Sequence, residues 1–323
     1  CMCGSDSKTP DYEFPDGPDP DPDPQPGDYP AGLTVTEFTD DLGGGKQCLG
    51  FVAVADLKAN PKLRFNAVHL PQQKIPSRIH AEFASANRGT ACVTTNAGYW
   101  WAGNSLSLLV TGGAVKSIEN QTVTRNNQTV YPVRSSFGQM SSGKFETHWI
   151  YCVLDDGNKP YAFPSALDND ERTNTYMSAP PTSKTPGAVL WTPQEAVGGG
   201  PMLVKEGKNV AVENYWKEVF DGGGIAGTSR QPRTAVGATA DGKLILLVCD
   251  GRNMRGSAGF TLAELADKLI ELGAVDAVNL DGGGSSTMVG SDGKVLNRPS
   301  DTGSAEVIVE RKISTAVVIS EVN

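Results

Sequence analysis

The 323-residue sequence has few histidines, no paired-cysteine motif and no long apolar run. Its three histidines, His69, His80 and His148, lack the spacing of metal ligands, so the pattern requires no metal and predicts no cofactor. None of the six cysteines forms a Cys-x-x-Cys pair, and no apolar segment approaches the roughly 18 residues that span a bilayer. The sequence also lacks a basic stripe, which argues against a nucleic-acid partner.

The negative charge of the chain is concentrated at its N-terminus. Residues 1–30 carry eight acidic residues and one lysine, a sum of −7 out of the formal net charge of −9. Repeated Asp-Pro steps predict an extended tether that cannot build a core. A cysteine followed by a polar linker resembles a bacterial lipoprotein, so we expect Cys1 to carry a lipid that anchors the chain to a membrane of the bacterial cell envelope. The alternative is an arbitrary first residue.

The remaining residues, 31–323, predict one domain of α/β (or α+β) class, with a mixed β-sheet core and few helices. Short apolar runs broken by Gly, Pro and Asn indicate many strands. Residues 31–90 are expected to form an N-terminal extension, with a helix over Ser77–Asn87. The polar, proline-rich residues 155–186 are expected to leave the core as an excursion or lid.

A βαβ unit is predicted in the second half of the domain. Strands Leu244–Cys249 and Ala274–Leu280 flank a helix over Leu262–Leu272, which opens with the capping-box pair Thr261 and Glu264. Parallel strands end at the same edge of a sheet, so this unit predicts a cleft that contains the residues following both strands.

The residues after the second strand form the densest chemical motif, Asn279-Leu-Asp-Gly-Gly-Gly-Ser-Ser-Thr-Met288. The glycines allow backbone amides to close around an anion, and the hydroxyls add donors. Asp281 is placed to act as base, nucleophile or charge stabiliser. A Gly-rich hairpin whose aspartate caps a turn is the alternative.

Two arginine motifs and an aromatic motif complete the predicted cleft. Asp250-Gly-Arg252 follows the first strand, and Arg233 enters an apolar strand, where its guanidinium needs an anionic partner. That partner is either a substrate phosphate or one of the two aspartates. Asn96-Ala-Gly-Tyr99 precedes two tryptophans and suits either stacking on a sugar or core packing.

These motifs occur in a fixed order that resembles the phosphodiester glycosidase family. In order, the matching strings are Gly198–Leu203, Arg233–Gly237, Asp250–Arg252, Leu262–Gly273, Asn279–Met288, Asn297–Asp301 and Glu310-Arg311. The resemblance implies an α/β body and hydrolysis of a sugar-1-phosphodiester at the anomeric carbon, which releases the sugar and leaves a phosphomonoester. Asn96-Ala-Gly-Tyr99 departs from the family's usual Asn-Gly-Gly-aromatic string.

A phosphomonoester is a good leaving group, since its second ionisation has a pKa of about 6, so strong general-acid assistance is less necessary. We therefore expect Asp281 to act at the sugar and Asp250 to orient Arg252 or a water, although these roles could be exchanged. The predicted substrate-binding residues are Arg233, Arg252, Asn96, Tyr99, Asn279, Gly282, Gly283, Gly284, Ser285, Ser286, Asp301 and Arg311.

Two other functions remain open at this point. A phosphodiesterase that breaks the P–O bond is one, although such enzymes usually hold two metals with His and Asp clusters. A non-catalytic glycan-binding surface lipoprotein is the other, because the tether and Trp100-Trp101 would suit it.

Overall fold

The computed structural model describes residues 12–13, 28–83, 88–302 and 304–323. Cys1 and most of the predicted tether lie outside the described residues, so the lipid anchor stays a prediction. Among the described residues, no helix has the length and apolar character needed to cross a membrane.

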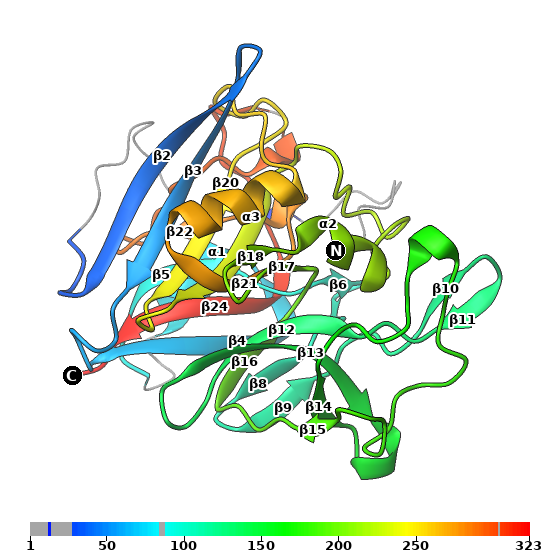
Figure 1. Cartoon of the computed structure of the whole chain (residues 1–323). Helices are drawn as coiled ribbons and strands as arrows, with labels where there is room; N and C mark the ends of the chain where they lie inside the picture. The colour runs from blue at the N-terminus through cyan, green and yellow to red at the C-terminus, as the bar shows by residue number, and fades with distance from the viewer. Residues whose placement is uncertain (1–11, 14–27, 84–87, 303) are drawn as a thin grey trace.

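Three β-sheets form the body, and every strand pair that the structure describes in them is antiparallel (Figure 1). The central sheet has the order β18-β17-β21-β19-β20-β3-β2. Its strands are β2 (Leu33–Gly43), β3 (Lys46–Ala55), β17 (Met202–Lys205), β18 (Lys208–Asn209), β19 (Arg233–Thr239), β20 (Leu244–Cys249) and β21 (Ala274–Asn279).

The other two sheets pack beneath the central sheet in the view of Figure 1. A four-stranded sheet has the order β22-β5-β24-β4, with β4 (Leu63–Lys74), β5 (Thr90–Asn96), β22 (Met288–Val289) and β24 (Ile313–Glu321). The lower sheet has the order β15-β14-β13-β12-β16-β8-β9, with β8 (Leu109–Thr111), β9 (Ala114–Ser117), β12 (Arg134–Gln139), β13 (Phe145–Val153), β14 (Lys159–Phe163), β15 (Val189–Leu190) and β16 (Glu195–Gly198).

Short elements connect and decorate these sheets. The strand pairs are β1 (Tyr12–Glu13) with β23 (Glu310–Arg311), β6 (Trp100–Trp101) with β7 (Asn104–Ser105), and β10 (Val123–Arg125) with β11 (Gln128–Val130). The α-helices are α1 (Pro76–Glu82), α2 (Ala211–Lys217) and α3 (Leu262–Glu271). The 3-10 turns are η2 (Leu154–Asp156), η3 (Glu171–Thr173), η4 (Gly283–Ser285) and η5 (Ser300–Thr302).

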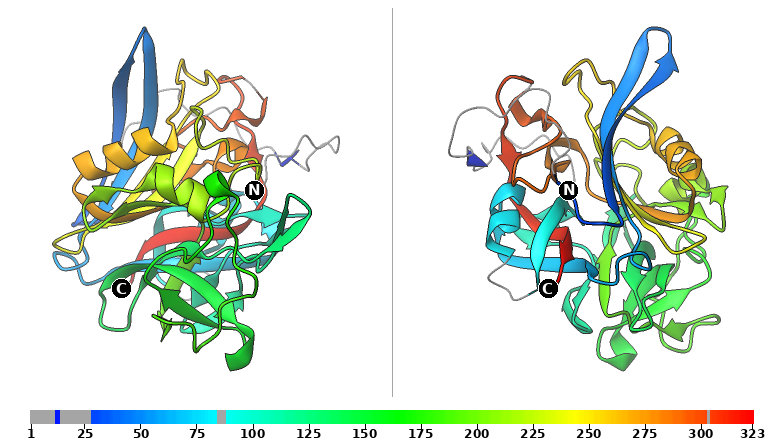
Figure 2. Two further views of the ribbon diagram at one scale, coloured as in Figure 1. Left: turned by 45° about the vertical axis from the view of Figure 1, so that its right-hand side comes forward. Right: turned by 90° about the vertical axis from the view of Figure 1, so that its left-hand side faces the viewer.

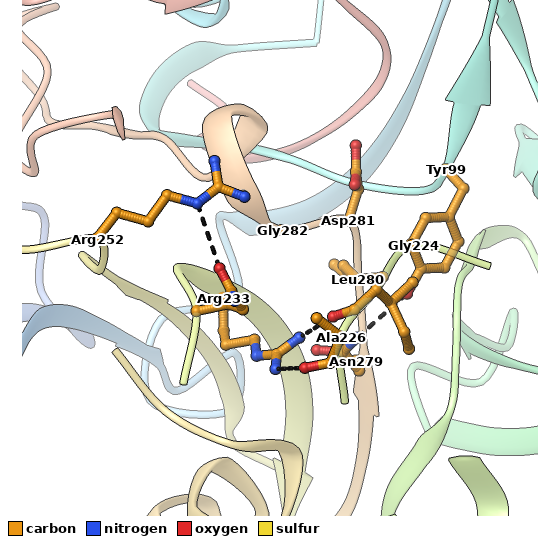
Figure 3. A pocket seen from close by; sticks show the side chains of 12 residues that line it. Tyr99, Gly224, Ala226, Arg233, Arg252, Asn279, Leu280, Asp281 and Gly282 are labelled. Carbon is orange, nitrogen blue, oxygen red and sulfur yellow. Dashed lines mark hydrogen bonds between the residues drawn. The ribbon is translucent and has the colours of Figure 1, made fainter. Parts of the chain in front are cut away.

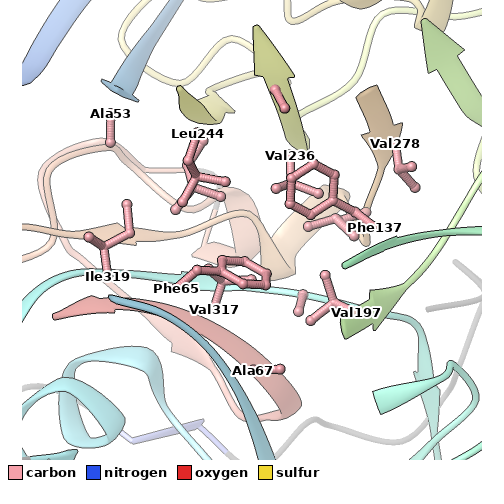
Figure 4. Close-up of a cluster of buried hydrophobic side chains, with 14 of the residues drawn as sticks. Ala53, Phe65, Ala67, Phe137, Val197, Val236, Leu244, Val278, Val317 and Ile319 are labelled. Carbon is pink, nitrogen blue, oxygen red and sulfur yellow. The ribbon is translucent and has the colours of Figure 1, made fainter. Parts of the chain in front are cut away.

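The main hydrophobic core lies where the three sheets meet. Figure 4 shows side chains from all three sheets in contact, and the labelled residues are Ala53, Phe65, Ala67, Phe137, Val197, Val236, Leu244, Val278, Val317 and Ile319. Each fully buried large apolar side chain contributes roughly 1.5–3 kcal/mol relative to exposure. The core therefore fixes the central sheet against its two neighbours.

The opposite face of the central sheet is covered by α2 and α3, which lie side by side over it in Figures 1 and 2. Strand alternation sends Ala235 to the helices and Val236 to the main core. With both faces covered, every residue of β20 is buried, which explains its continuous apolar sequence Leu-Ile-Leu-Leu-Val-Cys.

The fold class predicted from the sequence, a β-rich α/β or α+β body with few helices, is confirmed. The structure also has the β20–α3–β21 unit. Strands β20 and β21 run in the same direction, but β19 lies between them and is antiparallel to both. Helix α3 opens with the predicted capping box of Thr261 and Glu264.

The structure corrects one predicted helix and adds another. The helix predicted over Ser77–Asn87 is α1 at Pro76–Glu82, and residues 84–87 lie outside the described part of the chain. Helix α2 was not expected, because seven residues are too few to show a clear apolar period. Within residues 155–186, the structure places β14 as the second strand of the lower sheet and η3 in contact with α2.

Candidate active site

The predicted motifs meet at one edge of the central sheet. Arg233 opens β19 opposite Cys249, the last residue of β20, and Ala235 pairs with Asn279, the last residue of β21. Because β19 is antiparallel to both neighbours, its first residue lies beside their last residues. Asp250 and Asp281 each follow directly at this edge.

A cavity of about 270 Å³ opens there (Figure 3). It brings together seven of the predicted site residues with five others, and the full lining is Tyr99, Gly224, Ile225, Ala226, Gln231, Arg233, Arg252, Asn279, Leu280, Asp281, Gly282 and Gly283. Asp281 is the only carboxyl-bearing residue in this set. The cavity therefore brings together Asp281, Arg233 and Arg252 of the predicted shared cleft, whereas Asp250 does not line it.

Asp281 is held by its backbone. Its amide donates to Ala97 O at 2.9 Å, and its carbonyl accepts from Asn96 Nδ2 at 2.7 Å. Asn96 Oδ1 in turn accepts from Thr234 Oγ1 at 2.8 Å. Asn96 is 1% exposed and does not line the cavity, so its observed contacts position Asp281 rather than face a ligand.

Arg252 supplies the exposed cation of the cavity. Its Nε donates to Gln231 Oε1 at 3.2 Å, and its Nη1 lies 3.4 Å from Ser300 Oγ. It adopts the left-handed conformation with φ of 52°. Both contacts are to neutral side chains, which leaves the positive charge available to an anion.

Arg233 has a different role from the predicted phosphate clamp. It is 2% exposed and donates to the carbonyl oxygens of Phe260, Ile225, Ala226 and Ser229 at 2.8–2.9 Å. Three of these hydrogen bonds hold the loop that contributes Gly224–Ala226 to the cavity wall, and the fourth ties it to Phe260. These hydrogen bonds to backbone carbonyls differ from the phosphate or aspartate partner that the sequence suggested.

Asp250 lies behind the cavity wall. Its side chain is fully buried, with Oδ2 facing Arg255 Nε at 3.0 Å and Nη2 at 2.8 Å. Its Oδ1 accepts from the amide of Arg298 at 2.8 Å and from Asn297 Nδ2 at 3.1 Å. The guanidinium that pairs with Asp250 is that of Arg255 and not the predicted Arg252, while the alternative role of Asp250, orienting a water, stays a prediction.

Burial raises the pKa of the Asp250 carboxyl, and the charge of Arg255 opposes this shift. Burial likewise raises the pKa of the Tyr99 hydroxyl well above its ordinary value, so Tyr99 acts as a neutral donor. It donates to Gly200 O at 2.6 Å, and its ring packs on Phe220 with centroids 5.5 Å apart.

Within Gly282–Ser286, where the sequence predicts an anion nest, three backbone amides are hydrogen-bonded inside the protein. The amides of Gly283, Ser285 and Ser286 donate to Pro232 O, Gly282 O and Gly283 O. These three amide donors of the η4 turn therefore bind carbonyl oxygens of the protein itself. Ser286 Oγ also lies 3.0 Å from Thr234 Oγ1, while Gly282 and Gly283 line the cavity with backbone.

Asp301 and Arg311 pair with each other rather than face the cavity. Arg311 Nη2 donates to Asp301 Oδ1 at 2.6 Å and its Nε to Oδ2 at 2.9 Å. The pair packs on Gly284, where an added Cβ would lie 1.8 Å from Asp301 Oδ1. Gly284 is thus required for packing, and none of the three lines the cavity.

Sequence reasoning missed Glu218, a fully buried carboxyl group behind the Tyr99–Gly200 contact. It accepts from the amides of Ser135 and Met202 at 2.7 Å and from Trp149 Nε1 at 3.2 Å. Burial raises the pKa of Glu218 to about 7, although these hydrogen bonds act in the opposite direction. The segment around it mixes polar, charged and aromatic residues, so no sequence pattern indicated that this glutamate is buried.

The loop Gly224–Ala226 was also missed as part of the site. It follows Asp221-Gly-Gly-Gly224, a glycine triplet that the sequence alone marks only as a turn. Among the described residues, no group of three or more His, Cys, Asp or Glu side chains is arranged to hold a metal ion.

A sequence model of phosphodiester glycosidases matches residues 112–320. Among curated proteins, the Bos taurus N-acetylglucosamine-1-phosphodiester alpha-N-acetylglucosaminidase is 40% identical over 90 residues, which are 28% of this chain and 16% of that protein. The SPbeta prophage-derived uncharacterized protein YomE of Bacillus subtilis (strain 168) is 35% identical over 122 residues, 38% of this chain and 16% of YomE. The matched segments thus span about a sixth of each relative.

Solved structures share the fold at low identity. The catalytic domain of the zebrafish N-acetylglucosamine-1-phosphodiester alpha-N-acetylglucosaminidase, auto-inhibited by its pro-peptide, aligns with a TM-score of 0.56 and 20% identity over 90% of this chain and 82% of that chain. A putative exported protein of Burkholderia pseudomallei aligns with a TM-score of 0.57 and 15% identity, covering 85% and 74% of the two chains. These likenesses extend over most of the body.

Proposed function

Because the chain belongs to the phosphodiester glycosidase family, we propose that it hydrolyses a sugar-1-phosphodiester at the anomeric C–O bond. Water adds to the anomeric carbon, the C–O bond breaks, and the bond's electron pair leaves with the phosphate oxygen. The products are the free sugar and a phosphomonoester. The observation that carries the proposal is one cavity lined by both a carboxyl group, Asp281, and an exposed guanidinium, Arg252.

The charges of the cavity suit this reaction. As the C–O bond breaks, positive charge develops at the anomeric carbon and negative charge on the departing phosphate. Asp281 is placed to stabilise the carbon, attack it, or activate a water. Arg252 is placed to bind the phosphate as a charge-assisted donor. Its weak contacts with Gln231 and Ser300 allow it to adjust to the ligand.

The single carboxyl group in the lining fits a phosphate leaving group. Ordinary glycosidases need a second carboxylic acid to protonate a poor alkoxide leaving group. A phosphomonoester leaves as a stable anion, so the cation at the cavity can take the place of that acid. Asp250 does not supply a second carboxylic acid to the cavity, because its side chain faces Arg255.

The decisive experiment combines a substrate panel with one variant. Wild type and Asp281→Asn are assayed against phosphodiesters of several sugar-1-phosphates. We expect turnover by wild type and a loss of at least 1000-fold with the variant, in line with the loss of an essential catalytic carboxylate. Circular dichroism should show that the variant remains folded. Near-full turnover by Asp281→Asn would reject the role of this carboxyl group.

Hydrolysis in ¹⁸O-labelled water separates C–O from P–O cleavage. We expect the label on the anomeric carbon of the released sugar. Label on the phosphate would replace the proposal with a P–O-cleaving phosphodiesterase. The position of the ¹⁸O label therefore distinguishes the glycosidase from the phosphodiesterase.

A second candidate, glycan binding without catalysis, is favoured by Trp101, whose side chain is 46% exposed on the β6–β7 hairpin. Exposed indole rings stack on sugar faces. Calorimetry with the same phosphodiesters tests it: tight binding without turnover by wild type would support this function over hydrolysis.

A further inference from the structure

The amide group of Asn279 is fixed in one orientation at the cavity. Its Nδ2 donates to Tyr99 Oη at 3.2 Å and to Gly200 O at 3.1 Å. Tyr99 already donates its hydroxyl proton to Gly200 O at 2.6 Å, so toward Asn279 the phenol oxygen can only accept. Rotating the amide by 180° would place Oδ1 against two acceptors. The contacts therefore require that Oδ1 points away from them.

Asn279 Oδ1 has no hydrogen-bond partner among the described residues, and the side chain is 1% exposed. A buried acceptor without a partner costs roughly 1–3 kcal/mol, so proteins seldom keep one without a use. Asn279 belongs to the lining of the cavity with Asp281 and Arg252. The available partner is therefore a donor on whatever occupies the cavity.

The rest of the lining indicates which end of a substrate this acceptor meets. In the view of Figure 3, Asn279 lies with Leu280 and Ala226 below Asp281, while the guanidinium of Arg252 lies at the upper left. Leu280 and Ala226 offer apolar surface beside Asn279, and the nearby guanidinium of Arg233 already donates to the backbone carbonyls of Ile225 and Ala226, so this end suits a phosphate less than the Arg252 end does. The apolar surface suits an uncharged sugar ring with polar groups at its rim.

We infer that Asn279 Oδ1 accepts a hydrogen bond from a hydroxyl or N–H group of the sugar and so determines which sugars are hydrolysed, with Tyr99 and Gly200 as positioning groups. This inference rests on the proposed function. The sugar then enters with this donor toward Asn279, the anomeric carbon near Asp281 and the phosphate toward Arg252. A site of this kind rejects analogues that lack the donor, because its acceptor would remain buried and unpaired.

The test removes one donor at a time from the ligand. The probes are methyl phosphodiesters of glucose-, galactose-, mannose- and N-acetylglucosamine-1-phosphate. In their analogues one hydroxyl is replaced by fluorine or the amide N–H is methylated. With wild type, we expect removal of one particular donor to lower kcat/KM by about 5- to 150-fold, which corresponds to the 1–3 kcal/mol of an unpaired buried acceptor.

Variants of the cavity residues identify the protein group that accepts the hydrogen bond from this sugar donor. In Asn279→Ala the penalty at that position should shrink to about 2-fold or less, because the acceptor is gone. Asn279→Ser is the second variant in case Asn279→Ala is unstable, since serine keeps a hydroxyl that can donate to Gly200 O. Gln231→Ala removes the other amide of the lining and should leave the position-specific penalty as in wild type.

The outcomes separate the inference from the function beneath it. If no parent phosphodiester is hydrolysed, the proposed function and this inference both fail. If the parent phosphodiesters are hydrolysed but each analogue lowers kcat/KM by the same factor in wild type and in the Asn279 variants, only the inference fails. If Gln231→Ala rather than Asn279→Ala abolishes the penalty, Gln231 is the selecting residue and the inference is overturned.

Discussion

Arg255 Nη2 lies 2.8 Å from Asp250 Oδ2 in an ion pair whose carboxyl side chain is fully buried. Asp250 also binds the amide of Arg298, and its carbonyl accepts from Ser257 Oγ at 2.7 Å. The pair therefore ties together the loops that follow β20 and precede η5. Arg252 belongs to the first loop, and its Nη1 lies 3.4 Å from Oγ of Ser300, the first residue of η5.

Asp250→Asn should destabilise the protein by about 3–5 kcal/mol, because it leaves Arg255 in a buried position with a weakened counter-charge. Chemical denaturation measures this change. The matched control is Glu37→Gln, which removes the other carboxylate of Arg255 where its side chain is 37% exposed, and should cost less than about 1 kcal/mol. Equal losses of unfolding free energy in the two variants would show that Asp250 is not the main counter-charge of Arg255.

Arg252→Ala should raise KM for phosphodiester substrates by about 10- to 100-fold, the loss expected for a charge-assisted hydrogen bond of roughly 1.5–3 kcal/mol. Arg230→Ala is the control, because Arg230 pairs with Glu264 and does not line the cavity. Steady-state kinetics at low and moderate salt measures both. An unchanged KM in Arg252→Ala would remove this residue from phosphate binding.

Glu218 should make stability depend on pH. Burial raises the pKa of Glu218 from 4.5 to about 7, so the folded state binds this proton more tightly than the unfolded chain. The contribution is fully present below pH 4.5 and is lost as pH rises through about 7. Its size is on the order of 3 kcal/mol, from 1.36 kcal/mol per pKa unit.

Glu218→Gln removes the titrating group, so the difference in unfolding free energy between pH 5 and pH 8 should shrink. Urea denaturation at both values measures it. Glu264→Gln serves as control, because Arg230 and the Thr261 amide outweigh desolvation and hold the pKa of Glu264 below its ordinary value. An identical pH profile in wild type and Glu218→Gln would show that Glu218 does not titrate in this range.

Gly284→Ala should separate Asp301 from Arg311, since the new Cβ would meet Asp301 Oδ1 at 1.8 Å and Arg311 Nη2 at 2.6 Å. We expect a loss of about 1–3 kcal/mol from overpacking, measured by thermal unfolding. Gly223→Ala is milder, because its nearest contact is Phe220 O at 3.1 Å. A wild-type melting temperature in Gly284→Ala would show that the pair can move without cost.

The sequence by itself determined the local elements and the place of the cleft. The period of the apolar residues and the Thr261–Glu264 box specified α3, because both act within a few residues of chain. The direction of β20 and β21 followed from the connecting helix, and this was enough to bring Arg252 and Asp281 to one sheet edge.

Only the tertiary structure decided which side chains face the cavity and which support it. Asp250 and Asp281 look equivalent in sequence, each following a strand, but Arg255 and the Asn297–Arg298 segment enclose one of them. Arg233 resembled a phosphate clamp, but its guanidinium meets the carbonyls of Ile225, Ala226 and Ser229 in the preceding loop and that of Phe260. Asn297, Arg298 and Phe260 reach these side chains from segments far along the chain, and a local residue pattern does not specify such contacts.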